Sequence, residues 1–158
     1  MNIKITDNVA KIMRSIDALV DKDVLVGIPS SEAEREKGDP VNNAMVGYIS
    51  EFGSPANNIP ARPSLMPGIR NVKDKISERM VAAAKAALSG EMATVDRQLN
   101  AAGLIAQSSV RAMINSNIQP ALKASTIAAR KRRKITRTNT LIDTAQFRNE
   151  VTYVIRNK

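Results

Sequence analysis

The hydrophobic residues near the start of the chain recur with a helical period. Between residues 8 and 20 they fall three or four positions apart, which predicts an amphipathic helix. Its apolar face contains Val9, Ile12, Met13, Ile16, Leu19 and Val20. A short β-like segment at residues 3–5 precedes this helix. Either Thr6 or Asp7 can cap the helix, because both side chains accept hydrogen bonds from helix amides.

Two other segments have the patterns of strands. Residues 24–28 form a largely β-branched run that stops at Pro29, which predicts a buried strand. Residues 150–156 alternate well enough to predict a second strand, with one face formed by Val151, Tyr153 and Ile155. The segment 30–40 is polar, and its charges nearly balance. We interpret it as a solvated loop, or as a loop that reaches a neighbouring subunit.

Two helical stripes of apolar residues lie on either side of Gly90. The first stripe contains Ile69, Val72, Ile76, Met80, Ala84 and Ala87. The second stripe contains Met92, Val95, Leu99, Ala102, Ala106, Val110, Met113 and Ile114. Because glycine readily ends a helix, the stripes predict either two helices or one long helix kinked at Gly90. We interpret both stripes as core.

The predicted elements together define a fold class. Two or more strands with several helices predict an α+β fold, in which a small mixed or antiparallel sheet packs against two long helices. A chain of 158 residues is long enough for one modest hydrophobic core, so we expect a single domain over residues 1–158. A short helical turn is expected at residues 122–129, after Pro120.

Residues 47–70 combine the end of an amphipathic helix with a proline-rich connector. The apolar face of this helix, which we expect to be buried, contains Met45, Tyr48, Ile49 and Phe52. Gly53 is suited to end the helix, since glycine takes the left-handed conformation without a steric penalty. The connector is stiffened by Pro55, Pro60 and Pro63, while Pro67 can occupy the first turn of the next helix. The pattern predicts a rigid elbow with Arg62 at its centre.

Arg62 has two interpretations, both structural. It can anchor an interface, because the planar guanidinium group donates well to carboxylates and carbonyls across a contact. It can also be an internal tie that donates to the elbow's own carbonyls or pairs with Glu51, because buried backbone groups need partners.

The composition argues against an enzyme. The chain has no cysteine and no histidine, which removes disulfides, thiolate nucleophiles, common zinc sites and histidine catalysis. The acidic pattern nearest to a motif, Asp143-Thr144, is better explained as a turn cap. Gly47, Gly53 and Gly68 lack the spacing and the lysine of a phosphate-binding loop. We therefore expect no catalytic residues, no cofactor and no metal.

The net charge of +9 is concentrated near the C-terminus. Residues 120–158 carry ten basic and two acidic side chains. The basic run at residues 130–137 contains Arg130, Lys131, Arg132, Arg133, Lys134 and Arg137. Such dense like charges repel, so we expect a mobile segment at about residues 130–140 that can contact nucleic acid, dock on an acidic protein surface, or remain a solvated loop. The run contains no aromatic residue for base stacking, which argues against sequence-specific recognition of single strands.

Nothing in the sequence indicates a membrane protein. No apolar run approaches the roughly 20 residues that a bilayer-spanning helix needs. Residues 1–4 lack the apolar block of a signal peptide. We expect synthesis and assembly in the cytoplasm, with no membrane partner.

Two motifs resemble those of a known protein family. The first reads Tyr-Ile-x-Glu-Phe-Gly from residue 48, followed after a polar gap by Ile-Pro-Ala-Arg-Pro-x-Leu-x-Pro-Gly-Ile from residue 59. The second covers residues 141–154, where family members typically read Asp-Thr-Gly-x-Leu-Arg-x-Ser-Ile. This pattern resembles the neck and tail-completion proteins of tailed bacteriophages. The two motifs cover about a quarter of the chain, and their order matches one branch of the family.

The chain departs from the family pattern at four positions. Ala145 stands for glycine, Phe147 for leucine and Glu150 for serine in the second motif. Ser64 stands where the family usually has phenylalanine in the first motif.

The resemblance implies a structural virion protein, a subunit of a homo-oligomeric ring that joins the phage head to its tail. It implies assembly in the host cytoplasm and a final place in the virion neck, beside portal or connector and tail terminator proteins and near packaged DNA. The interface and structural residues would be Tyr48, Glu51, Phe52, Gly53, Pro60, Arg62 and Pro63. The alternative from another class is a small nucleic-acid-binding protein that uses the basic run.

Overall fold

The computed structural model describes residues 9–29, 42–143 and 145–158. In these residues the chain forms helices and a two-stranded antiparallel sheet of β1 and β2, which confirms the α+β prediction. The order is α1 (Val9–Val20), β1 (Lys22–Gly27), α2 (Asn43–Phe52), the 3-10 helix η2 (Pro55–Asn57), α3 (Leu65–Arg70), α4 (Lys73–Leu88), α5 (Met92–Asn115), α6 (Ala124–Arg132), α7 (Gln146–Glu150) and β2 (Thr152–Asn157). The predicted strand at 3–5, the caps Thr6 and Asp7, and the loop at 30–40 lie outside the described residues.

The chain forms two compact units, each assembled from segments that are far apart in sequence. Unit 1 comprises Met1–Leu25, Lys73–Ile105 and Val154–Lys158, and unit 2 comprises Val26–Val72 and Ala106–Tyr153. The boundaries fall inside β1, α5 and β2 as well as between α3 and α4. Each unit has a hydrophobic cluster of its own. The expectation of a single domain stays a prediction.

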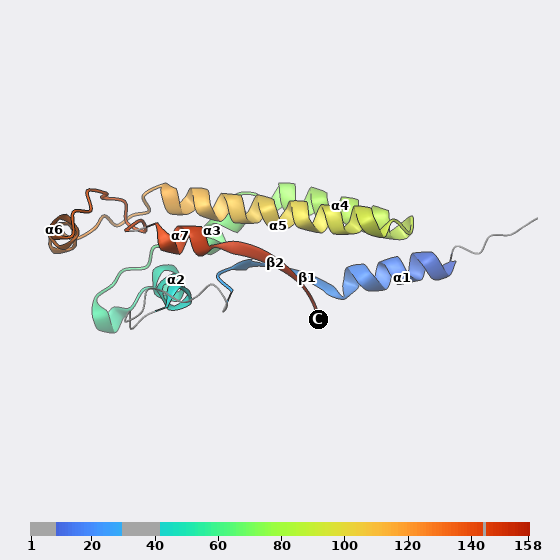
Figure 1. Ribbon diagram of the computed structural model, residues 1–158, viewed down its shortest axis with the longest axis horizontal. Coiled ribbons are helices and arrows are strands. Elements are labelled where there is room, and N and C mark those ends of the chain that lie inside the picture. The colour runs from blue at the N-terminus through green and yellow to red at the C-terminus, as the bar shows by residue number, and fades with distance from the viewer. Residues whose placement is uncertain (1–8, 30–41, 144) are drawn as a thin grey trace, which may run out of the picture. The chain divides into compact units, whose positions relative to one another are not determined.

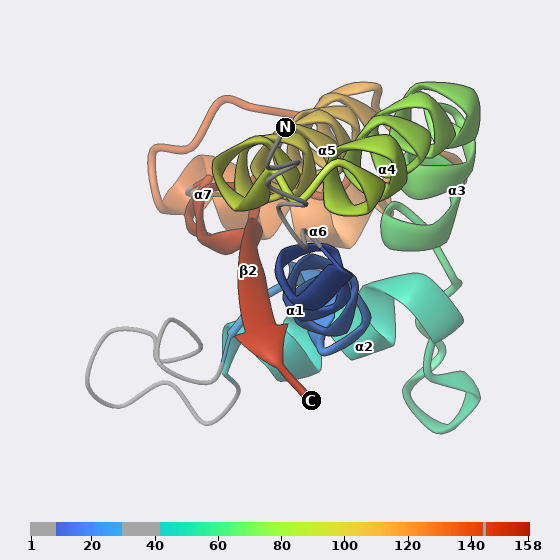
Figure 2. The ribbon, with the colours of Figure 1, turned by 90° about the vertical axis from the view of Figure 1, so that its right-hand side faces the viewer.

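Unit 1 is built on α4 and the first half of α5, which lie side by side (Figures 1 and 2). Its buried core consists of Ala83, Ala86, Ala87, Val95 and Leu99, covered by Ile16, Leu19, Val24 and Ile155. Small alanine side chains allow α1 to approach α4 closely, and these two helices contact each other. This core therefore joins faces of three helices, α1, α4 and α5, to one residue from each strand.

A glycine turn separates α4 from α5, so the alternative with two helices is confirmed. Gly90 has φ 72°, and its N–H donates to the Ala87 carbonyl at 2.9 Å. The Glu91 N–H donates to the Ala86 carbonyl, also at 2.9 Å. These two bonds form the Schellman arrangement that ends helices at a left-handed residue.

The predicted core faces of unit 1 need correction. Met80 is exposed. The buried face of α4 contains Ala87, as predicted, together with Ala83 and Ala86, which were not predicted. On α1 the expected apolar face is divided, since Ile16 and Leu19 join the core while the exposed side chains are Val9, Met13 and Val20. The narrow contact between closely packed helices buries alanines in preference to the longer side chains beside them.

Unit 2 gathers shorter elements around the second half of α5. Its buried cluster consists of Val110, Ile114, Ile142 and Val151, with Leu65, Ile69 and Phe147 packed against it. The α5 stripe is confirmed as core across both units, because its buried members are Val95, Leu99, Ala102, Ala106, Val110 and Ile114. Pro67 lies in the first turn of α3, a separate short helix rather than the start of α4.

The first predicted stripe is therefore divided between two cores. Ile69 on α3 packs into the cluster of unit 2, whereas the buried alanines of α4 form the core of unit 1. A helical period indicates an apolar face but carries no information about which core receives it.

Candidate interaction site

The first motif folds as the end of α2, a tight turn, and an extended segment that leads into α3, all in unit 2. Gly53 ends α2, as predicted, and its N–H donates to the Ile49 carbonyl at 2.7 Å. Its φ is 77°, and a Cβ there would lie 2.9 Å from both the Ala61 nitrogen and the Ile59 oxygen. Ser54 and Ile59 pair as an isolated antiparallel bridge. The turn therefore needs glycine for its backbone angle and for space.

Glu51 caps the next helix. Its Oε2 accepts from the N–H groups of Ser64 and Leu65 at 2.8 and 2.9 Å. Its Oε1 accepts from the Met66 N–H at 3.0 Å. The first amides of a helix have no partners within the helix, and a carboxylate there also meets the positive end of the helix dipole. The sequence predicted Glu51 as a partner of Arg62 and as an interface or structural residue. The cap itself was not predicted, because the glutamate lies 13 residues before the first amide that it caps.

Arg62 is an internal tie, but its partners differ from those expected. Its Nε donates to the Pro120 carbonyl at 2.7 Å, and its Nη2 donates to the Ala121 carbonyl at 3.2 Å. Its backbone N–H donates to the Ser50 carbonyl at 2.6 Å. Partial burial lowers the pKa of the guanidinium group, because desolvation disfavours the charged form. Arg62 thus fastens the elbow to a segment almost 60 residues later, rather than to Glu51 or to the elbow's own carbonyls.

Two prolines of the elbow, Pro60 and Pro63, lie on either side of Arg62 in the sequence. Pro60 is exposed and Pro63 is half-buried, and both precede α3 in a segment without regular secondary structure. Lys123 adds a further link, since its Nζ donates to the Asn58 carbonyl at 3.3 Å. The prolines restrict the φ angles of the elbow. Hydrogen bonds hold it before Pro60, at Asn58, and after Pro63, at Ser64, so its local conformation is fixed.

Most of the apolar face predicted for α2 is exposed rather than buried, although its fourth residue, Ile49, is half-buried. Met45 is 51% exposed, Tyr48 63% and Phe52 66%, and we call these three residues the exposed α2 face. The Tyr48 and Phe52 rings lie 4.9 Å apart between centroids. The opposite side of α2 packs inward because Gly47 admits Phe147, whose Cε2 would lie 3.3 Å from a Cβ at position 47. A glycine in the middle of a helix was the available signal that this side approaches another element.

An apolar groove borders the exposed α2 face. It has a volume of about 330 Å³, and Tyr48 and Phe52 contribute to its wall. The groove is also lined by Leu65 and Met66 of α3 and by Ile28, Gly47, Val110, Phe147 and Val151. Large exposed aromatic side chains beside an apolar groove are typical of protein interaction sites.

The second motif lies against the first, since α7 and α2 contact each other (Figure 1). Ala145 has φ 69°, in the left-handed region, at the position where the family pattern has glycine. Ile142 is buried in the cluster of unit 2, and Phe147 packs against that cluster. The suggested role of Asp143-Thr144 as a turn cap involves Thr144, which lies outside the described residues, and Asp143 itself pairs with arginines.

The basic run is divided by the end of α6, which includes Arg130, Lys131 and Arg132 in its last turn. Arg130 is only 6% exposed, and its Nη1 donates to the carbonyls of Arg137 and Asn139 at 3.2 and 2.7 Å. Its Nε lies 3.6 Å from Asp143 Oδ1, while Arg133 Nη2 lies 2.8 Å from Asp143 Oδ2. Arg130 therefore serves the fold and does not belong to the exposed surface of the run.

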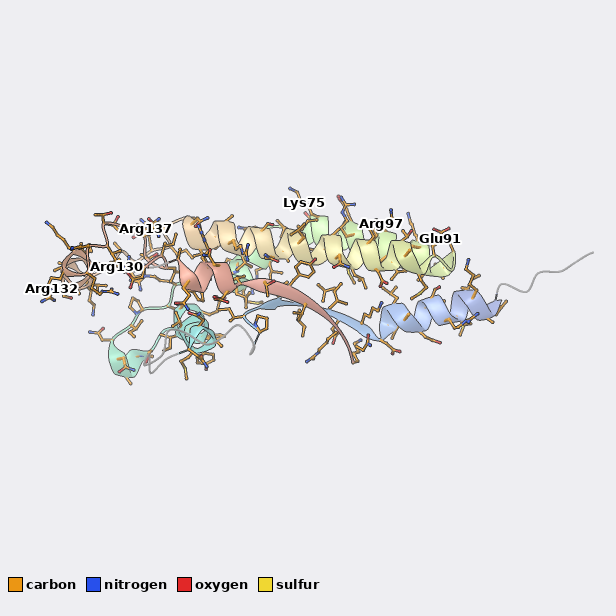
Figure 3. The ribbon with its side chains drawn as sticks, in the orientation of Figure 1. Lys75, Glu91, Arg97, Arg130, Arg132 and Arg137 are labelled. Carbon is orange, nitrogen blue, oxygen red and sulfur yellow. The ribbon has the colours of Figure 1, made fainter. Side chains whose placement is uncertain are left out.

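The other cations of the run are exposed, namely Lys131, Arg132, Arg133, Lys134 and Arg137. Figure 3 shows Arg132 on the outer side of α6 and Arg130 on the side that faces Arg137. The segment bends at Lys134, which has φ 61°. Mobility of residues 130–140 in the free subunit stays a prediction.

The described part of the chain offers no group of three His, Cys, Asp or Glu side chains that could hold a metal ion. Within the same residues, no helix is both long and apolar enough to cross a bilayer.

The residues of the first motif have different surroundings. Glu51, Gly53 and Arg62 stabilise the local backbone, whereas the side chains of Tyr48 and Phe52 are exposed to solvent. The chain matches no protein-family model, no curated protein and no solved structure.

Proposed function

We propose that this chain is a structural, non-enzymatic subunit of a tailed-phage virion, which forms a ring at the neck and joins the head to the tail. The observation that carries the proposal is the exposed α2 face on a locally fixed support. Its two aromatic rings are exposed although the helix that bears them is held by the Glu51 cap and by the Arg62 tie.

The chemistry of this face suits a protein partner. Tyrosine and phenylalanine are enriched at interface cores, because each buries a large area with few rotatable bonds. A support fixed by hydrogen bonds reduces the entropy that binding would otherwise cost. The residues of the first motif thus have two roles in this proposal. Glu51 and Gly53 build the support, and Tyr48 and Phe52 make the contact with the partner.

The proposed partners are neighbouring copies of the same chain, together with portal or connector proteins on one side and tail terminator proteins on the other. This assignment rests on the resemblance of the two motifs to neck and tail-completion proteins. The proposed location is the neck of the virion.

The test is assembly of particles with altered subunits. A variant that combines Tyr48→Ser and Phe52→Ser should fold normally, because both side chains are exposed, but should give fewer joined heads and tails. The matched control is Leu104→Ser, which alters an exposed apolar residue on α5. An unchanged yield of joined particles, or a neck image with only one or two copies of the subunit, would contradict the proposal.

A second candidate is a small nucleic-acid-binding protein, favoured by the exposed cations around the end of α6. Lysine and arginine side chains that neutralise phosphates release counterions, so the affinity falls steeply as salt rises. Salt-sensitive binding of the isolated subunit to short duplex DNA would favour this candidate. Ring formation without DNA would favour the neck subunit.

A further inference from the structure

A polar pocket in unit 2 lies apart from the exposed α2 face and has no role in the proposed assembly. Its volume is about 240 Å³. Its walls come from α2, the elbow, the end of α6, the segment before α7 and the start of α7. Its polar lining residues are Ser50, Arg62, Arg130, Thr140, Asp143 and Gln146. Small-molecule sites usually occupy about 300–1,000 Å³, so this pocket suits a small ion better than a nucleotide.

Two arginines line the pocket, and each is only partly used by the fold. The bonds of Arg62 to Pro120 and Ala121 use its Nε and Nη2. The bonds of Arg130 use its Nη1, and its Nε faces Asp143. Among the described residues, no hydrogen bond uses Nη1 of Arg62 or Nη2 of Arg130. Each guanidinium group is therefore held in place and keeps N–H groups for another acceptor.

Two buried oxygens in the same pocket lack hydrogen-bond partners within the described residues. They are Oγ1 of Thr140, a residue that is only 6% exposed, and Oδ1 of Asp143. Buried polar atoms are nearly always satisfied, because an unpaired one costs free energy. Asp143 Oδ1 can only accept, so a ligand that satisfies it must donate a hydrogen bond.

The charges in the pocket favour an anion. Arg62 and Arg130 oppose the single carboxylate of Asp143, which is also paired with Arg133. Guanidinium groups match the oxygens of phosphate and carboxylate groups closely. A simple carboxylate would satisfy the arginines but has no hydrogen to donate to Asp143. A phosphate that keeps one O–H group can do both.

We propose that this pocket binds a small oxyanion of the phosphate class that retains a hydroxyl group. Arg62 and Arg130 donate to its charged oxygens, the Thr140 hydroxyl donates to the same group, and the phosphate O–H donates to Asp143 Oδ1. The ligand links the elbow, the end of α6 and the segment before α7. Its source is either free phosphate or the singly ionised monoester phosphate of a larger molecule, which keeps one O–H group below its second pKa of about 6.

The experiment is calorimetric titration of the purified chain at constant ionic strength with inorganic phosphate, methyl phosphate and dimethyl phosphate. The pH is about 5, below the second pKa of about 6 of a phosphate monoester, so that methyl phosphate keeps its hydroxyl group. Inorganic phosphate should bind with one site per chain. Dimethyl phosphate should bind at least about tenfold more weakly, because it has no hydroxyl group for Asp143. Equal binding of methyl phosphate and inorganic phosphate would identify the monoester group as sufficient, and preference for inorganic phosphate would identify the free ion.

Thr140→Val should weaken the binding of inorganic phosphate about tenfold, since valine keeps the shape and removes the hydroxyl. The matched control is Thr136→Val, at an exposed position in the same segment, and a second control is Arg132→Gln, which removes an exposed charge from α6. Both controls should bind as the parent does. Circular dichroism verifies the fold of each variant.

Three results would overturn the proposal. The first is the absence of saturable phosphate binding by the parent chain. The second is equal binding of phosphate and dimethyl phosphate. The third is equal weakening by Thr140→Val and by either control, which would indicate attraction to the overall positive charge.

Discussion

The two units are stabilised by different means. Unit 1 is held by a continuous apolar contact in which Ala83, Ala86 and Ala87 of α4 meet Val95 and Leu99 of α5. Unit 2 has a hydrophobic cluster of its own, and its irregular segments are also fastened by charged side chains that bind backbone groups. Glu51 holds the start of α3, Arg62 holds residues 120–121, and Arg130 holds residues 137–139.

This difference determines how each unit should respond to mutation. Regular packing distributes the stabilisation over a face, so that the loss of a side chain leaves a cavity in the helix contact. The side-chain ties of unit 2 concentrate the stabilisation at a few donors and acceptors, and each tie fixes the position of one segment of the backbone. Four substitutions test this comparison, in order of decreasing expected effect.

Leu99→Ala should have the largest effect, because Leu99 is fully buried in the core of unit 1. The expected loss is about 2–5 kcal/mol of unfolding free energy, from lost burial and from the cavity left behind. Urea denaturation measures it. Leu104→Ala on the same helix, where the side chain is exposed, should change stability by less than about 0.5 kcal/mol. Similar losses for the two variants would refute the proposed core of unit 1.

Gly68→Ala should destabilise unit 2 through a steric clash. The added Cβ would lie 2.8 Å from Val110 Cα, where α3 packs against α5 and Ser109 Oγ donates to the Gly68 carbonyl at 2.7 Å. Overpacking of this kind costs about 1–3 kcal/mol. The control is Gly27→Ala, since a Cβ at position 27 meets no atom within 4 Å. Thermal unfolding of the two variants should therefore differ, and equal melting temperatures would contradict the close approach of α3.

Glu51→Gln should cost about 1 kcal/mol, because glutamine keeps an oxygen for the α3 amides but loses the charge that favours them. Hydrogen exchange at Ser64, Leu65 and Met66 should accelerate more than exchange in α4. Glu78→Gln, at an exposed position on α4, serves as the control. If the two variants have the same exchange rates at α3, Glu51 does not cap that helix in solution.

Ala145→Gly should have the smallest effect and the opposite sign. Alanine at φ 69° bears a steric penalty that glycine avoids, although glycine loses more entropy on folding. The net result should be a gain of about 0.5–1 kcal/mol, measured by urea denaturation. A loss of stability would show that position 145 does not adopt the left-handed conformation.

The sequence predicted the regular parts of the molecule well. The period of the α5 stripe identified Val95, Leu99, Val110 and Ile114 as core, and Gly53 and Gly90 marked the ends of α2 and α4. These features are local, because they depend on helix geometry and on the backbone freedom of glycine. The mixture of helices with a small sheet followed from the same patterns.

The long-range ties could not be read from the chain. Arg62 binds carbonyls at residues 120 and 121, and no pattern within the elbow encodes a partner so distant in sequence. The inward side of α2 was also misjudged, because Tyr48 and Phe52 suggested a buried face by composition. The side of α2 that packs inward contains Gly47. This side is stabilised by the close approach of the Phe147 ring, and glycine itself contributes no apolar side chain that a hydrophobic pattern could reveal.

The division of the chain between the two units has a consequence for synthesis on the ribosome. Both units include residues of β2, since Tyr153 belongs to unit 2 and Val154 belongs to unit 1. Domains made from one continuous segment can fold as soon as that segment emerges, but neither unit here is complete until β2 has been translated. The apolar face of α5 must therefore wait for its final partners while the nascent chain is still attached. A chaperone that shields this helix during translation should increase the yield of folded subunit.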